Sequence, residues 1–184
     1  MIVPNSRVYF GACETVDGLD MGVIKIGLSH NPVERLKMVT TTEPFICKLI
    51  CSTPGDMFLE YFCHMWLRED RVAGEFFRRS DEAKRLMASI QETGGLPFPI
   101  VFVEPEGMFI HLDVAGYMDR NSITFRDIEK ATGISTQSYK KLLQRNKSGN
   151  RRFLAAVAVT AVKKGLTIHW SRDFRPVEEA KVAA

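Results

Sequence analysis

The chain has 184 residues, of which 45% are hydrophobic and 26% are charged, with a formal net charge of +3. This composition is typical of a globular protein with one ordinary domain or two small ones. It excludes a helical membrane span, because no apolar run approaches the roughly 18 residues that such a helix needs.

The first part of the chain predicts two strands, a helix and a third strand. Residues 7–12 and 23–27 are rich in β-forming residues, and we expect them to pair as a hairpin with a long connection. Asn31 is a favourable N-cap and Pro32 suits the first helical position, so a helix is expected to begin here. Residues 45–51 are expected to form the third strand.

Two more helices are expected to follow. Asp56 should cap a helix over residues 57–68, whose apolar positions run nearly all round, as is typical of a buried helix. Glu60 and His64 are four residues apart and therefore share one face of this helix. Residues 82–90 predict the next helix, which Ser80 opens and two glycines close.

The second part begins with a linker and a short strand, expected over residues 97–105. A turn signal predicts a hairpin between residues 101–103 and 108–112. Helical periodicity then predicts helices over residues 124–132, 135–146 and 151–164. The following residues, 166–170, are β-like.

Short motifs between residues 7 and 90 resemble those of the GIY-YIG nuclease superfamily. In the order of the family they are Arg7-Val8-Tyr9, Lys25-Ile26-Gly27, Arg35 on the following helix and Glu60 on the buried helix. The phage-type branch, in which the second motif reads Lys-Ile-Gly, is more similar, since it shares Leu59-Glu60 with His64, and Arg71 with Gly74-Glu75-Phe76-Phe77. The resemblance implies a metal-dependent endonuclease that hydrolyses DNA phosphodiester bonds, with one Mg²⁺ or Mn²⁺ bound by Glu60.

The resemblance also implies the fold class, which is α+β. We expect a nuclease domain in residues 1–95, with a small, mixed three-stranded sheet flanked by helices. For residues 96–184 we expect a mainly helical, basic region that resembles a helix-turn-helix and binds DNA.

The residue types of the first part suit phosphodiester hydrolysis. The reaction needs an attacking water, neutralisation of charge on the phosphoryl oxygens and proton transfer. Arg35 can donate paired hydrogen bonds to phosphate oxygens, and Glu60 can bind a hard divalent cation. Tyr9 or His64 could move the proton, and Lys25 completes the expected catalytic set.

Each of these residues also has a structural interpretation. Tyr9 and His64 could be core side chains. Glu60 could form an ion pair with Arg35 or Lys25, because an ionised carboxylate on an apolar helix needs a partner. The family usually has Tyr, a candidate general base, where this chain has Lys25. A non-cleaving DNA-binding regulator built on a degenerate nuclease fold is therefore the alternative function.

The charge is divided unevenly between the two parts. Residues 1–95 carry 11 Lys and Arg against 13 Asp and Glu, whereas residues 96–184 carry 14 against 9. Residues 140–164 include eight basic side chains and no acidic one. Such a stretch favours a polyanionic partner, although a basic solvated helix or a surface that binds an acidic protein gives the same pattern.

Residues 125–143 resemble a helix-turn-helix, for which a plain helical hairpin is the alternative. Gly133 suits the turn, and Ser135 suits the N-cap of the second helix. The side chains expected to contact bases or phosphates of double-stranded DNA are Thr136, Gln137, Ser138, Lys140, Lys141, Arg145, Lys147, Arg151 and Arg152.

The four cysteines predict neither a disulfide framework nor a zinc site. Cys47 and Cys51 would lie about 13 Å apart on one strand, too far for two ligands of one zinc ion. We expect both, with Cys13 and Cys63, to be small buried side chains. With no secretion leader recognised, a cytoplasmic protein is expected.

Overall fold

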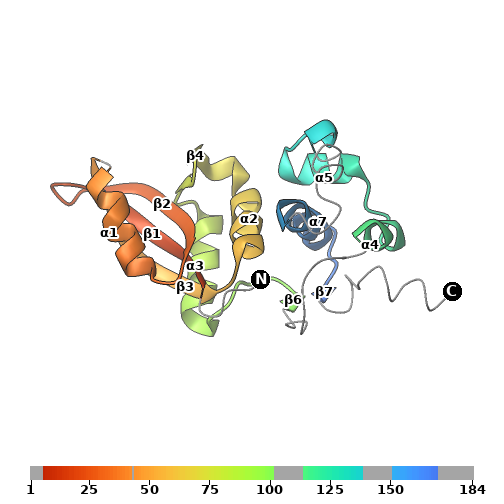
Figure 1. The fold of residues 1–184 in the computed structure, drawn as a ribbon, viewed down its shortest axis with the longest axis horizontal. Coiled ribbons are helices and arrows are strands. Elements are labelled where there is room, and N and C mark those ends of the chain that lie inside the picture. The colour runs from red at the N-terminus through yellow and green to blue at the C-terminus, as the bar shows by residue number, and fades with distance from the viewer. Residues whose placement is uncertain (1–5, 43, 102–113, 139–150, 170–184) are drawn as a thin grey trace. The chain divides into compact units, whose positions relative to one another are not determined.

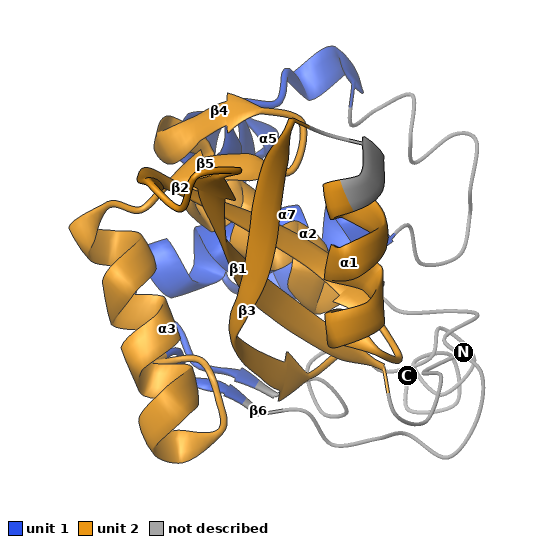
Figure 2. Cartoon of the chain, turned by 90° about the vertical axis from the view of Figure 1, so that its left-hand side faces the viewer, with its two compact units in different colours: residues 1, 98–184 blue, residues 2–97 orange. Residues whose placement is uncertain are grey.

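The computed structural model describes residues 6–42, 44–101, 114–138 and 151–169 (Figure 1). The chain divides into two compact units, one of Ile2–Pro97 and one of Met1 with Phe98–Ala184 (Figure 2). Within the described ranges, no helix is long and apolar enough to cross a membrane.

The N-terminal unit is α+β and contains a five-stranded antiparallel sheet. The strand order is β3-β1-β2-β5-β4, and each neighbouring pair is antiparallel. The strands are β1 (Arg7–Thr15), β2 (Asp20–Ser29), β3 (Phe45–Pro54), β4 (Arg71–Ala73) and β5 (Phe76–Arg78). The mixed three-stranded sheet predicted from the sequence is therefore wrong.

The two additional strands, β4 and β5, extend the sheet beyond β2. Each has three residues, and Gly74 between them has a φ of 50°. Segments this short cannot show the period-two alternation by which a strand is identified in a sequence. They become strands through tertiary pairing, in which Lys25 of β2 lies opposite Phe76 of β5.

The β1–β2 hairpin has longer strands and a shorter connection than the sequence predicts. Residues 16–19 join the two strands, so the predicted long connection is wrong. The spacing between Tyr9 and Lys25 is instead taken up by paired strand residues. In this register Tyr9 lies opposite Gly27.

Three helices pack around the sheet: α1 (Pro32–Thr42), α2 (Met57–Trp66) and α3 (Asp81–Thr93), with a 3-10 helix at Arg68–Asp70. Asn31, Asp56 and Ser80 accept hydrogen bonds of 2.9 to 3.3 Å from the first N–H groups of these helices. Gly94 ends α3 with a φ of 77°. These caps confirm the predicted helix boundaries at these positions.

Alternate residues of β1 lie on different faces of the sheet. Val8 and Phe10 are completely buried, whereas Tyr9 packs with Leu36 of α1 and Cys47 of β3. The helix α1 lies across β3 and β1 on this side (Figure 2). Because successive side chains of a strand point to opposite faces, Tyr9 and its cross-strand neighbours belong to the α1 face.

The C-terminal unit contains α4 (Val114–Arg120), α5 (Phe125–Thr132) and α7 (Arg151–Lys163), and the parallel strands β6 (Ile100–Val101) and β7 (Ile168–His169). The residues from Phe153 to Ala161 of α7 are all buried. Phe125 stacks on Phe153 with ring centres 6.1 Å apart, which packs α5 against α7. The predicted hairpin falls on residues 102–113, which lie outside the described ranges.

Candidate functional site

The ring of Tyr9 covers Gly27 of the neighbouring strand. A Cβ atom at position 27 would lie 2.5 Å from the Tyr9 hydroxyl oxygen and 2.7 Å from its Cζ atom. Glycine therefore leaves the room that the ring needs. The Tyr9 side chain is 1% exposed, and burial, with smaller contributions from the charges of Glu75 and Glu60, raises the pKa of Tyr9 to about 12.

Arg35 of α1 reaches the same hydroxyl group. Its side chain lies close enough to the Tyr9 hydroxyl that its positive charge opposes the effect of burial on the Tyr9 pKa. Arg35 itself is exposed. A guanidinium has five N–H donors, so this contact leaves others that can bind phosphate oxygens.

The carboxylate of Glu60 on α2 lies near Leu28, close to the end of β2, and the Leu28 N–H favours the charged form of this carboxylate. Burial, followed by the negative charge of Glu75, raises the pKa of Glu60 to about 7. The nearby charges of Lys25 and Arg35 act in the opposite direction. Lys25 forms its ion pair with Glu75, and among the described residues neither Lys25 nor Arg35 forms an ion pair with Glu60.

The ion pair of Lys25 and Glu75 joins β2 to the turn between β4 and β5. The Lys25 side chain is 6% exposed, whereas the Glu75 side chain is 48% exposed. The ammonium also lies 5.0 Å from the centre of the Phe76 ring, a cation–π contact. Glu75 is not among the site residues predicted from the sequence, and the signal that could have indicated it is its place in the segment Gly74-Glu75-Phe76-Phe77.

His64 is buried on α2 and contacts the backbone of β2. Its Nε2 atom lies 3.2 Å from the Ile26 carbonyl oxygen, and its ring centre lies 5.2 Å from that of Phe77. Burial lowers the pKa of His64 to about 4, so the imidazole is neutral at neutral pH. These contacts connect α2 to the sheet, and proton transfer by His64 stays a prediction.

Four of the predicted catalytic residues are thus brought together from four elements: Tyr9 from β1, Lys25 from β2, Arg35 from α1 and Glu60 from α2. Tyr9 is affected by the charges of Arg35 and Glu60, and Glu60 by those of Lys25 and Arg35. A guanidinium, a carboxylate and a phenol in one cluster can bind a phosphate, hold a cation and orient a water.

The oxygen donors of this cluster fit a hard divalent cation. Mg²⁺ is typically held by one or two carboxylates, with water and substrate phosphate as its other ligands, and Glu60 provides such a carboxylate. Among the residues that the structure describes, no group of three or more His, Cys, Asp and Glu forms a larger metal-binding cluster. The four cysteines are free and buried.

The predicted turn of the helix-turn-helix segment is present. Thr124 and Asp127 form a capping box at the start of α5, and Gly133 ends this helix with a φ of 69°. The next helix begins at Thr136, whose hydroxyl donates a hydrogen bond of 2.8 Å to the Glu129 carboxylate.

The other predicted DNA contacts are only partly within the described ranges. Gln137 and Ser138 are exposed at the start of the second helix. Arg151 is half-buried and Arg152 is exposed in the first turn of α7. The residues outside the described ranges are Lys140, Lys141, Arg145 and Lys147.

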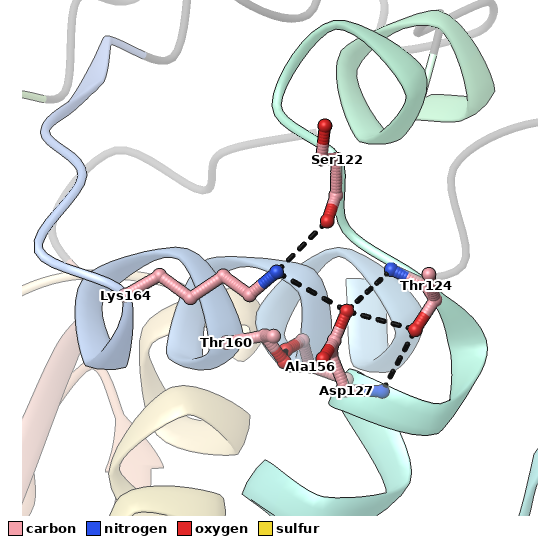
Figure 3. Close-up of polar contacts among 6 residues, drawn as sticks. All are labelled: Ser122, Thr124, Asp127, Ala156, Thr160 and Lys164. Atoms are coloured by element: carbon pink, nitrogen blue, oxygen red, sulfur yellow. Dashed lines mark hydrogen bonds and ion pairs between the residues drawn. The ribbon is translucent and has the colours of Figure 1, made fainter.

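The last two residues of the basic stretch bind the C-terminal unit itself. Lys164 donates hydrogen bonds to the Ser122 carbonyl at 2.8 Å and to the Asp127 carboxylate at 3.1 Å (Figure 3). Lys163 donates to the Ala131 carbonyl at 2.9 Å. Because Asp127 is near the start of α5 and Ala131 near its end, the two lysines hold both ends of this helix.

Comparisons with known proteins do not assign the chain to a family. No family model matches it, and no curated protein or solved structure matches it significantly. The resemblance to GIY-YIG nucleases therefore depends on the motifs between residues 7 and 90.

Proposed function

We propose that the protein is a metal-dependent DNA endonuclease of the GIY-YIG type that hydrolyses phosphodiester bonds. The observation that carries this proposal is the convergence of Tyr9, Arg35 and Glu60 beside the Lys25–Glu75 ion pair. Ionisable groups with strongly shifted pKa values are costly to bury and cluster at functional sites. Glu60, whose pKa is raised to about 7, is the clearest example.

Each group has a role that suits its chemistry. Arg35 binds the non-bridging oxygens of the scissile phosphate and stabilises the charge that develops on them. Tyr9, whose hydroxyl is close to Arg35, orients the guanidinium. Glu60 would hold Mg²⁺ or Mn²⁺, which supplies Lewis acidity and lowers the pKa of a bound water.

The C-terminal unit supplies affinity for double-stranded DNA in this proposal. Gln137 and Ser138 are exposed at the start of the second helix of the helix-turn-helix segment, where such proteins contact base edges. The basic residues between positions 140 and 152 add contacts with phosphates.

A non-cleaving DNA-binding regulator is the second candidate function. One observation favours it: Lys25 stands where the family usually has Tyr, and its ammonium is buried in an ion pair with Glu75. A phenol that could act as general base is therefore absent from this position. Such a protein would bind DNA and leave it intact.

Incubation of supercoiled plasmid with Mg²⁺ tests the first proposal against the second. The wild type should produce nicked or linear DNA, and Glu60→Gln should lose this activity because the amide does not replace the charged ligand. Glu34→Gln removes an exposed carboxylate of α1 and should cut normally. Calorimetric titration with Mn²⁺ should show one site that is absent in Glu60→Gln. A wild type that binds DNA without cutting it indicates the regulator.

A further inference from the structure

The two side chains that sequence analysis offers for proton transfer are both poorly placed for it. The Tyr9 side chain is 1% exposed, and its hydroxyl lies over Gly27. His64 is buried, with its Nε2 atom on the Ile26 carbonyl. A general base must reach the attacking water directly or through one other water, so an accessible group is needed.

Glu75 is an accessible member of this cluster. Its side chain is 48% exposed, and Lys25 binds one of its two oxygens, Oε2. A carboxylate has about four acceptor sites, so Oε1 can accept a hydrogen bond from water. Lys25 and Gly27 are two residues apart on β2 and therefore share a face of the sheet, so the carboxylate that Lys25 holds is next to the position that the Tyr9 hydroxyl covers. The charge of Glu75 accordingly raises the pKa values of both Tyr9 and Glu60.

The turn that carries Glu75 is fixed to the sheet. The Ile26 N–H donates a hydrogen bond of 3.0 Å to the Glu75 carbonyl. Arg71 donates one of 2.9 Å to the Gly74 carbonyl, and its guanidinium lies 5.0 Å from the Phe77 ring centre. Backbone and side chain of Glu75 are therefore both held, as preorganised catalysis requires.

The burial of Lys25 explains why this pair exists. Its side chain is 6% exposed, so the ammonium is poorly placed to bind a DNA phosphate itself. A buried ammonium needs a partner, because an unpaired charge away from water is costly. Its exposed partner, Glu75, is the end of the pair that meets solvent.

We propose that Glu75 is the general base of the hydrolysis and that Lys25 is the positioning residue that holds it; this rests on the proposed nuclease function. As the water oxygen forms its bond to phosphorus, Glu75 takes one proton from that water. The bond between phosphorus and the leaving deoxyribose oxygen breaks, and that oxygen takes a proton from solvent. Glu75 then releases its proton to solvent. The pair thus replaces the phenol that the family usually has at position 25.

Single-turnover cleavage at saturating DNA and Mg²⁺ tests this role. Glu75→Gln keeps the shape of the side chain and an oxygen for Lys25, but it removes the base. It should cut at least about 10²-fold more slowly, the lower end of the usual contribution of general base catalysis, with unchanged DNA affinity. The matched control is Glu69→Gln, whose carboxylate is 80% exposed on the neighbouring 3-10 helix and which should cut normally.

Rescue by a small carboxylate separates a base from a structural residue. Glu75→Ala opens a space beside the Lys25 ammonium, and sodium formate should restore cleavage by at least about tenfold, whereas sodium chloride of equal ionic strength should not. The double variant Lys25→Met/Glu75→Ala lacks the anchor and should not be rescued. Circular dichroism of each variant verifies that it is folded.

The outcomes separate this role from the proposed function. Normal cleavage by Glu75→Gln, or a loss in Glu75→Ala that formate does not reverse, overturns the role of Glu75 alone, provided that the wild type cuts and Glu60→Gln does not. A wild type that does not cut DNA under these conditions overturns the proposed function, and the role of Glu75 with it.

Discussion

The two units use their charged residues in opposite ways. In the N-terminal unit, the charges of Arg35, Glu75 and Glu60 act on the buried Tyr9, and the buried ammonium of Lys25 is paired with Glu75. In the C-terminal unit, Lys163 and Lys164 bind carbonyl and carboxylate groups at the ends of α5. Not every residue of a basic run is therefore available to bind a partner. A single charged residue on an otherwise apolar helix or strand is a better indication of a functional site.

One carboxylate from each unit shows this difference, because the pKa of Glu60 is raised and the pKa of Asp127 is lowered. Burial raises the pKa of Glu60 from 4.5 to about 7, so the folded state loses stability as pH rises through this range. The Thr124 N–H, followed by the Thr124 hydroxyl and Lys164, lowers the pKa of Asp127 from 3.8 to about 2. Asp127 therefore stabilises the fold above this range, and that contribution is lost as pH falls through it.

The largest expected effect is that of Arg35→Ala, which removes the guanidinium from the candidate site. Cleavage should fall by about 10² to 10³-fold, the usual cost of losing one preorganised donor to the transition state. Affinity for DNA should change little, since most phosphate contacts are expected in the other unit. Single-turnover rates and DNA titrations measure the two quantities. Lys37→Ala, an exposed cation of the same helix, is the control.

Gly27→Ala should have the next largest effect, because it displaces the Tyr9 ring. The new Cβ atom would lie 2.5 Å from the hydroxyl oxygen, so the ring must move away from its contact with Arg35. A displacement of about 1 Å in a site can lower a rate by about 10²-fold, and we expect a similar loss of cleavage. Gly95→Ala, where an added Cβ atom meets nothing within 4 Å, should cut normally. Normal rates in both would mean that the position of Tyr9 is unimportant.

The sequence predicts those features of this unit that depend on nearby residues. Asn31, Asp56 and Ser80 accept hydrogen bonds from N–H groups two or three residues ahead, so helix starts are visible locally. The motifs that resemble those of GIY-YIG nucleases likewise indicated four residues that lie near one another in the structure. They are Tyr9, Lys25, Arg35 and Glu60.

What the sequence did not predict depends on distant partners. Lys25 and Glu75 are 50 residues apart, and either could have paired with several opposite charges. Their pairing follows from the addition of β5 to β2, and three-residue strands have no periodicity to reveal them. The role of Gly27 likewise becomes visible only once the register places Tyr9 opposite it.

Glu60→Gln should change the stability of the N-terminal unit, independently of cleavage. A neutral amide avoids the cost of a buried charge, so the variant should be more stable than the wild type at pH 8 by about 1 to 3 kcal/mol. The upper value corresponds to the shift of the Glu60 pKa from 4.5 to about 7. At pH 4 the carboxyl is protonated in both states, and the gain should vanish. Urea unfolding at the two pH values without divalent metal measures the difference, and an equal effect at both would contradict it.

Lys141→Ala tests the DNA-binding role of the basic stretch. If about four of its residues contact phosphates, the logarithm of affinity should fall with the logarithm of salt concentration with a slope of about −3.6. Loss of one such contact should make this slope shallower by about 0.9. Fluorescence anisotropy with a short DNA duplex at several salt concentrations measures it. An unchanged slope would remove Lys141 from the predicted contacts.

Lys164→Met should have the smallest effect, and it should be on stability alone. Methionine keeps the length of the side chain but cannot donate to the Ser122 carbonyl, which lies in a residue with a φ of 51°. The ion pair with Asp127, which is also lost, is partly exposed and contributes little, whereas the hydrogen bond to Ser122 contributes about 1 kcal/mol net, so amide hydrogens of α5 should exchange about fivefold faster in the full chain. The salt slope should not change, because this ammonium is already bound within its own unit. A slope shallower by about one unit, as expected for Lys141→Ala, would instead show that Lys164 leaves these partners for a phosphate. Lys164 would then be one of the cations that the C-terminal unit offers to DNA.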